Sequence, residues 1–359
     1  MRGAIITHIL RISNNSNFNS TFLFYIFSTF TVYIYEVCAY DLTSRKMHIA
    51  IFDTDVPVPA VYTKHGLYST RFRTLLQAAA ARLKQSGTIP NDTTIHTSAY
   101  DTSHGVYPLD ENLRTTSTCS STSADDNNNI IDGILITGSA NAVYDNEPWI
   151  KQLETYIQHV FDNFPRVKIF GSCFGHQAVA DVLLSHSVRV EKCPLGRETG
   201  IVPITLHERF CHSMPHFVAH RENDHSGNDR RTNRQLRLQL VHGDWVVPRG
   251  YSASGSAPAT GTGTELPRPW VNLGSTDICP IQGLYYPGRV FSLQGHFEFD
   301  TFINRESVRE FGRRLGWDTS LVEEHIERIN LSAREGDDDD DDDDDSNVAA
   351  EAVVLFFLS

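Results

Sequence analysis

After residue 46, short apolar runs of β-type composition alternate with longer segments that carry apolar residues at helical spacing. This alternation predicts an α/β fold, with an open, mostly parallel sheet flanked by helices. The runs that predict strands are 48–52, 130–136, 167–170, 188–190, 200–206, 238–242, 281–286 and 289–293. The segments that predict helices are 71–84, 148–161 and 174–185.

Polar stretches interrupt this pattern and predict surface insertions without a chemical role. They lie near 115–129, 212–234 and 252–265. Nine consecutive aspartates, Asp337 to Asp345, repel one another too strongly to pack. We therefore predict a folded domain over 47–335 and a disordered acidic tail over 336–359.

Residues 1–46 are predicted to be a non-core extension. They contain an apolar run over 22–35, which is shorter than the ~20 residues that a membrane-spanning helix needs. No clear small-residue cleavage site follows this run. Because Met47-His-Ile-Ala-Ile-Phe52 predicts an opening strand, Met47 is an alternative start, and membrane attachment through 22–35 is the less favoured hypothesis.

Charge and cysteine content narrow the classes of function. The formal net charge of −13 includes the nine aspartates, so the rest of the chain is only mildly acidic. It offers no basic face for a phosphate backbone, which argues against nucleic acid as a partner. Six cysteines without close pairs argue against a disulfide framework and against a paired-thiolate zinc site, and favour a reducing, cytoplasmic compartment.

One cysteine lies in a glycine-flanked turn between a predicted strand and a predicted helix. Val167-Lys-Ile-Phe170 is followed by Gly171-Ser-Cys-Phe-Gly175 and then by the helical segment. This order is typical of a nucleophile elbow, in which small neighbours tolerate a strained backbone. A helix start favours a thiolate and offers free backbone N–H groups. We therefore predict that Cys173 is a nucleophile rather than a buried, inert cysteine.

Such a nucleophile needs a proton donor, and His296 is the favoured candidate among 16 histidines. It closes a β-type run in Ser292-Leu-Gln-Gly-His-Phe-Glu298, and the two-residue period of a strand puts Glu298 on the same face. Glu298 is then expected to accept a hydrogen bond from the imidazole, which gives a Cys-His-Glu arrangement. An isolated His-x-Glu is more often a pair of surface residues, so this prediction depends on the turn at Cys173.

Together these segments resemble the class I glutamine amidotransferases, which join a cysteine elbow to a downstream His-x-Glu on an open, flavodoxin-like α/β sheet. The further segments in family order are Ile136-Thr-Gly-Ser139, Gly175-His-Gln177, His242-Gly-Asp-Trp-Val246 and Leu273-Gly-Ser-Thr-Asp-Ile-Cys-Pro-Ile-Gln282. The resemblance covers about 47–335 and is to the stand-alone, GMP synthase glutaminase-like branch. Phe297 stands where the family usually has proline, a departure that bears on the His-Glu geometry.

The resemblance implies hydrolysis of a γ-glutamyl amide through a thioester. The residues it implies are Cys173, His296 and Glu298 for catalysis, Gly138 and Phe174 for the oxyanion, and Gln177 for the γ-glutamyl substrate. This chemistry calls for no metal and no organic cofactor. The expected partners are a small-molecule substrate, either glutamine or a γ-glutamyl compound, and a separate synthase subunit that accepts ammonia.

Several alternatives stay open at this point. A γ-glutamyl peptidase or hydrolase acting on glutathione-like compounds would use the same chemistry. Cys173, Asp244 and His296 would instead reproduce the nucleophile-acid-histidine order of α/β-hydrolases. A degenerate amidotransferase fold would serve as a binding protein. His242 and Asp244 either line a substrate cleft or shape a loop, and Cys279 is predicted to be buried in the core.

Overall fold

A seven-stranded sheet forms the centre of the computed structural model, which describes residues 46–115, 130–215, 234–251, 265–333 and 344–359. The strands, in spatial order, are β2 (Thr94–Asp101), β1 (Lys46–Asp53), β3 (Gly133–Ile136), β4 (Lys168–Ser172), β12 (Val290–Leu293), β11 (Gly283–Tyr286) and β9 (Val271–Asn272). The first five are parallel, whereas β11 and β9 run antiparallel to their neighbours. The sheet is therefore open and mostly parallel, as predicted.

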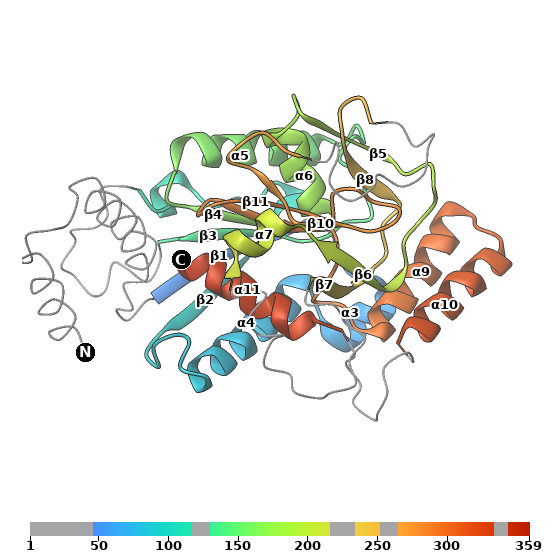
Figure 1. Cartoon of the computed structure of the whole chain (residues 1–359), viewed down its shortest axis with the longest axis horizontal. Coiled ribbons are helices and arrows are strands. Elements are labelled where there is room, and N and C mark those ends of the chain that lie inside the picture. Colours follow the sequence, from blue (N-terminus) through green and yellow to red (C-terminus); the bar gives the residue numbers. More distant parts are fainter. Residues whose placement is uncertain (1–45, 116–129, 216–233, 252–264, 334–343) are drawn as a thin grey trace, which may run out of the picture. The chain divides into compact units, whose positions relative to one another are not determined.

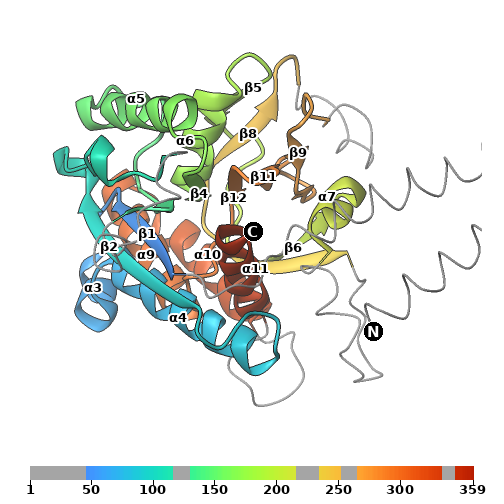
Figure 2. The same cartoon turned by 90° about the vertical axis from the view of Figure 1, so that its left-hand side faces the viewer.

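Helices cover both faces of this sheet (Figures 1 and 2). In β1, Ile49 and Ile51 pack in one apolar cluster with α4 (Tyr68–Gln85) and α11 (Ser346–Leu358). Ala50 and Phe52 pack in another cluster with α5 (Pro148–Asn163) and α6 (Phe174–Leu183). Successive side chains of a strand point to opposite faces, so a strand that is apolar at every position requires cover on both sides. The predicted α/β class is confirmed.

Smaller elements surround the carboxyl ends of the parallel strands. A three-stranded sheet contains β10 (Gly274–Ser275), β6 (Gly200–Leu206) and β7 (Gln235–Leu240), and a separate pair joins β5 (Val188–Lys192) to β8 (Asp244–Pro248). The remaining helices are α3 (Pro59–His65), α7 (Glu208–Ser213), α9 (Thr301–Leu315) and α10 (Thr319–Ser332), with short 3-10 turns at Thr102–His104 and Asp110–Asn112. Segments beside β5, β6, β7 and α9 supply much of the site described below.

Several predicted segments lie outside the described residues. They include 1–45 with its apolar run, and nearly all of the three predicted insertions. Within the described part of the chain, no helix is both long enough and apolar enough to cross a membrane.

The C-terminal helix α11 corrects the prediction of a disordered tail. Every residue from Ala349 to Leu358 is buried, and the helix packs against α4 (Figure 2). The helix is apolar nearly all round, which suits a position inside the core. Lys168 Nζ donates to the carbonyl of Phe356 at 2.8 Å and so satisfies part of its C-terminal end. The tail prediction rests on the charge of the aspartates and gives the apolar segment that follows them no part in the core.

The last aspartate of the run is itself part of the fold. The backbone N–H of Arg237 in β7 donates to the Asp345 carboxylate at 2.5 Å, and the Asp345 N–H donates to the Arg237 carbonyl at 2.8 Å. Asp345 directly precedes α11, where a carboxylate interacts favourably with the helix dipole. The prediction of a disordered tail is therefore wrong from Asp345 onward, while 336–343 lie outside the described residues.

Replacement of Phe356 by Ala is expected to lower the free energy of unfolding by ~3–5 kcal/mol, because it removes a buried aromatic ring from the core. The Phe356 ring lies 5.7 Å from that of Phe291 in β12, centroid to centroid. Urea denaturation measures the change, and Leu331→Ala, at a largely exposed position of α10, serves as the control with a change within ~0.5 kcal/mol. Equal stability of Phe356→Ala and the unaltered protein would show that α11 is not part of the core.

Candidate active site

Cys173 lies in the sharp turn between β4 and α6, where the sequence predicts it. Its φ is +50°, the only positive value at a non-glycine position in the described part of the chain. A Cβ at Gly171 would collide with the Gly175 carbonyl, and one at Gly175 would lie 2.5 Å from the Ile136 carbonyl oxygen. The two glycines are therefore required by close backbone contacts, and together with the turn they fix the position of the thiol.

The structure brings His296 and Glu298 together, although neither lies in a regular strand. Strand β12 ends at Leu293, and the His296 N–H pairs with the carbonyl of Gln239 at 2.9 Å. His296 Nδ1 lies 2.7 Å from Glu298 Oε1, and the two residues are only 2% and 1% exposed. Because a carboxylate accepts, Nδ1 carries the proton and Nε2 is left to face the cleft. The predicted pairing of the two side chains therefore holds in a loop.

Neighbouring residues fix the orientation of this pair. The Ser172 hydroxyl also donates to Glu298 Oε1, at 3.1 Å. The His296 ring stacks on Phe299, with centroids 3.9 Å apart and an interplanar angle of 17°. Phe297 points into the core and packs edge-on against Phe72 at 5.3 Å. This packing anchors the loop in the core. The short contact between His296 and Glu298 is therefore kept even though phenylalanine stands in place of proline.

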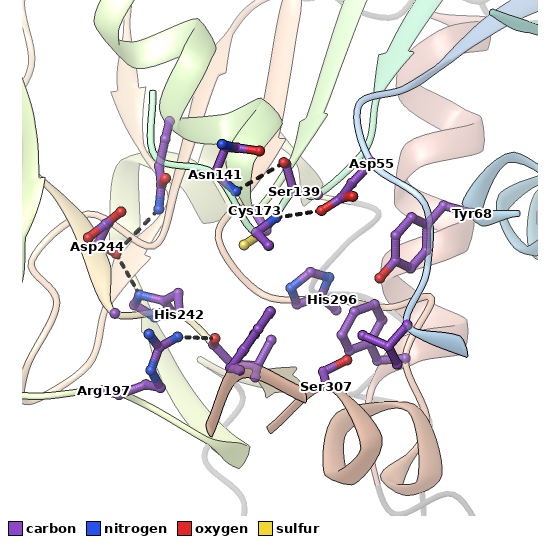
Figure 3. A pocket seen from close by; sticks show the side chains of 18 of the residues that line it. Asp55, Tyr68, Ser139, Asn141, Cys173, Arg197, His242, Asp244, His296 and Ser307 are labelled. Atoms are coloured by element: carbon purple, nitrogen blue, oxygen red, sulfur yellow. Dashed lines mark hydrogen bonds between the residues drawn. The ribbon is translucent and has the colours of Figure 1, made fainter. Parts of the chain in front are cut away.

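Cys173 and His296 lie side by side in one pocket (Figure 3). Gly138, which follows β3, packs closely against both residues. A Cβ at Gly138 would lie 3.2 Å from His296 Cε1 and 3.6 Å from Cys173 Cβ. The backbone N–H groups of Gly138 and Phe174 have no acceptor in the described part of the chain. Two free donors beside a thiol are suited to bind an oxyanion.

Electrostatics favour a charged His296. Burial acts to lower the pKa of its imidazole, but the charges of Glu298 and Cys173, and hydrogen bonds to both, outweigh burial and raise the pKa to about 10. His296 is therefore an imidazolium at neutral pH, paired with a carboxylate on one side and with the thiol on the other.

Two glutamines connect the thiol to the far side of the cleft. Gln294 Nε2 lies 3.5 Å from Cys173 Sγ, and Gln294 Oε1 accepts from Gln177 Nε2 at 3.0 Å. Gln177 was predicted to contact substrate; its amide also donates to the Asp244 carbonyl at 3.3 Å. Sequence reasoning missed Gln294 as a site residue. A polar residue at the end of an apolar strand, two positions before His296, was the available signal.

Asp244 and His242 line the same pocket but do not join Cys173 in a triad. Asp244 Oδ1 accepts from the Tyr144 hydroxyl at 2.8 Å, and no hydrogen bond links Asp244 to His296 among the described residues. His242 Nδ1 donates to the Asp244 carbonyl at 2.8 Å, and its Nε2 lies 3.0 Å from Glu198 Oε2. This geometry does not support the nucleophile-acid-histidine arrangement of α/β-hydrolases, in which Asp244 would orient His296.

The pocket is a cleft that is partly open to solvent. Its rim includes the exposed apolar side chains of Val56 and Leu315, 54% and 61% exposed. Cys279 lies outside it, fully buried as predicted, and burial raises the pKa of its thiol. Among the described residues, no group of three or more acidic, cysteine or histidine side chains is arranged to hold a metal ion.

Comparisons with known proteins confirm the resemblance to the glutamine amidotransferase-like proteins, although no family model matches the chain. A Schizosaccharomyces pombe protein with the provisional name glutamine amidotransferase-like protein is 25% identical over 263 residues, 73% of this chain and 83% of the relative. A Saccharomyces cerevisiae protein, provisionally named a glutamine amidotransferase, is 30% identical over 182 residues, 49% of this chain and 56% of the relative.

A more distant relative carries a different name. Gamma-glutamyl peptidase 3 of Arabidopsis thaliana is 23% identical over 177 residues, 49% of this chain and 58% of that protein. A solved glutamine amidotransferase of Thermotoga maritima superposes with a TM-score of 0.46 at 14% identity, over 87% of this chain and 99% of that one.

Proposed function

We propose that this protein is a cysteine-dependent hydrolase of γ-glutamyl amides. The observation that carries the proposal is the meeting of a strained, helix-capping Cys173 with the buried His296–Glu298 pair in one open cleft. A nucleophile, a proton carrier and a group that orients the carrier are the three parts that acyl transfer through a thioester requires.

In the first step, the Cys173 thiolate attacks the γ-carbonyl carbon. The resulting oxyanion accepts hydrogen bonds from the N–H groups of Gly138 and Phe174, each worth roughly 3 kcal/mol in such sites. His296 gives its Nε2 proton to the leaving nitrogen, the C–N bond breaks, and ammonia or an amine departs. Water then attacks the thioester carbon and gives a proton to His296, the C–S bond breaks, and glutamate departs from the restored Cys173 thiolate and His296 imidazolium.

The pKa of His296 is expected to change during these steps, because it depends on the charge of Cys173. In the free protein, part of the increase in its pKa comes from Cys173. Acylation converts the thiolate into a neutral thioester, which removes that contribution and lowers the pKa of His296. His296 is then a better proton donor to the leaving nitrogen, and the neutral imidazole that remains can act as the base toward water. Glu298 remains beside Nδ1 throughout and keeps Nε2 aimed at the reacting atoms.

The names of the relatives support two substrates for the same chemistry. Two relatives are named as glutamine amidotransferases or similar to them, which supports glutamine and a separate synthase that accepts the ammonia. The third is named a γ-glutamyl peptidase. The open cleft with Val56 and Leu315 at its rim favours this second candidate, because apolar rim atoms can contact a leaving group larger than ammonia.

Glutamate release from glutamine, from γ-glutamyl peptides and from simple esters distinguishes these candidates, with Cys173→Ala as the blank. Release from γ-glutamyl peptides by the isolated protein supports the peptidase. Slow release from glutamine that rises with an added synthase supports the amidotransferase. Turnover of esters alone, or no release of glutamate from any γ-glutamyl compound, would contradict the proposed function.

A further inference from the structure

Arg197 brings a positive charge into the cleft that the reaction steps above do not use. It lies in the segment between β5 and β6, on the side of the pocket that also holds His242 and Asp244 and opposite Tyr68 (Figure 3). Burial lowers the pKa of the Arg197 guanidinium from its ordinary value, which marks a partly desolvated cation.

The guanidinium is held in a fixed position. Nη1 donates to the Val241 carbonyl at 2.9 Å, and the guanidinium carbon lies 5.0 Å from the Trp317 ring centroid and 5.6 Å from that of Phe311. On the other side, a Cβ at Gly243 would lie 2.8 Å from Nη2, so the guanidinium packs closely against the Gly243 backbone. Aromatic rings and backbone thus hold the cation before any ligand arrives.

No carboxylate pairs with Arg197 among the described residues, which distinguishes it from the other arginine of the cleft. Arg314 also lines the pocket, but its Nε donates to Glu310 at 2.8 Å. Asp244 is near enough to influence the charge of Arg197, yet its carboxylate is hydrogen-bonded to the Tyr144 hydroxyl. A partly buried cation without a counter-ion is costly, and an anionic ligand would offset that cost.

We propose that Arg197 binds a carboxylate of the substrate and so restricts this cleft to γ-glutamyl compounds that carry a carboxylate at that position. This inference rests on the proposed function, because it assigns the charge of the molecule that Cys173 attacks. A guanidinium donates two parallel N–H groups to a carboxylate, a contact that a neutral amide cannot reproduce. A γ-glutamyl peptide carries one carboxylate on the glutamyl side and one on the leaving side, and either has the required chemistry.

Arg197→Met tests the proposal with three substrates that differ only in carboxylates. They are γ-glutamylglycine with both, γ-glutamyl methylamide with the glutamyl carboxylate, and 4-aminobutanoyl-glycine with the leaving-side carboxylate. We expect KM to rise ~10- to 100-fold for the substrates whose carboxylate meets Arg197, with kcat within ~3-fold, because the contact exists before and during the reaction. A rise in KM for γ-glutamylglycine and γ-glutamyl methylamide places the glutamyl carboxylate at Arg197. A rise for γ-glutamylglycine and 4-aminobutanoyl-glycine places the leaving-side carboxylate there.

Two control variants separate this contact from a general effect of charge. Arg197→Lys keeps the charge without the bidentate fork and is expected to lose less than Arg197→Met. Arg314→Met is expected to change KM by less than ~3-fold, since the Arg314 guanidinium already has Glu310 as a hydrogen-bond partner. Unchanged KM in Arg197→Met for all three substrates would overturn the proposal. So would an equal loss in Arg314→Met, which would show that substrate senses only the field of the cleft.

A binding measurement distinguishes failure of this inference from failure of the proposed function. Calorimetric titration of Cys173→Ala with γ-glutamylglycine requires no turnover, and the melting temperature of each variant checks its folding. Binding that weakens ~10-fold or more when Arg197→Met is added supports Arg197 even if the unaltered protein releases no glutamate. Equal binding in the two variants, or no binding to Cys173→Ala, overturns it, whatever the outcome of the activity assays.

Discussion

Replacement of Cys173 by Ala is expected to lower kcat/KM for glutamate release by ~10,000-fold or more. Removing the nucleophile of a triad costs most of its rate enhancement, because the other groups act on the covalent intermediate and cannot replace it. Alanine keeps the small volume that the turn between Gly171 and Gly175 requires, so the fold is expected to persist. Steady-state release of glutamate from the best γ-glutamyl substrate measures the effect.

Cys211→Ser is the matched control, because Cys211 is a half-buried thiol on α7 that does not line the cleft. It is expected to retain full activity. Cys173→Ser keeps a hydroxyl at the same position and is expected to be nearly as inactive as Cys173→Ala, since a hydroxyl is a far weaker nucleophile without a matched base. Substantial activity in Cys173→Ala would remove the thioester from the mechanism.

Replacement of His296 by Gln is expected to lower kcat ~1,000-fold while KM changes little. Glutamine can still donate a hydrogen bond to Glu298, but it cannot carry the proton to the leaving nitrogen, a role worth ~100- to 10,000-fold. Because the loss falls on a group that acts in the transition state, kcat and kcat/KM are expected to fall together.

Glu298→Gln and Asp244→Asn identify the partner of His296. Glu298→Gln removes the charge that lies 2.7 Å from Nδ1 and is expected to cost a large part of the His296 effect. Asp244→Asn leaves that contact intact and is expected to cost far less. The reverse result, with Asp244 essential and Glu298 dispensable, would contradict this arrangement and favour the order of the α/β-hydrolases.

The sheet could be predicted from sequence because its strands are apolar at consecutive positions. Both faces of β1 are covered, so its four central residues are all buried, and the run at 48–52 is unmistakable. β2 was missed because it lies at the edge of the sheet, where exposed and half-buried positions give no continuous apolar run. α11 was missed for a different reason: the aspartates before it dominate the local composition, while only packing against α4 shows that the helix belongs to the core.

Some residues of the candidate site could be predicted from the sequence, and others could not. Cys173 could be found because close backbone contacts require glycines at fixed positions around it, and His296 because Glu298 follows at a short spacing. Arg197 and Gln294 left no comparable local signal. Their roles arise from residues far apart in sequence: Arg197 lies against Gly243 and Trp317, and Gln294 lies between Cys173 and Gln177. Contacts of this kind depend on the tertiary fold, which no local pattern records.

Covalent labelling of the purified protein with an electrophilic glutamine analogue, such as a chloroketone, determines whether Cys173 is the nucleophile. Intact-mass and peptide mass spectrometry are expected to show one adduct per chain, located at Cys173 and suppressed by γ-glutamyl substrate. Cys173→Ala is expected to remain unlabelled, although the other five cysteines of the chain are still present. Absence of an adduct, or an adduct on another cysteine that substrate does not suppress, would contradict the proposed nucleophile.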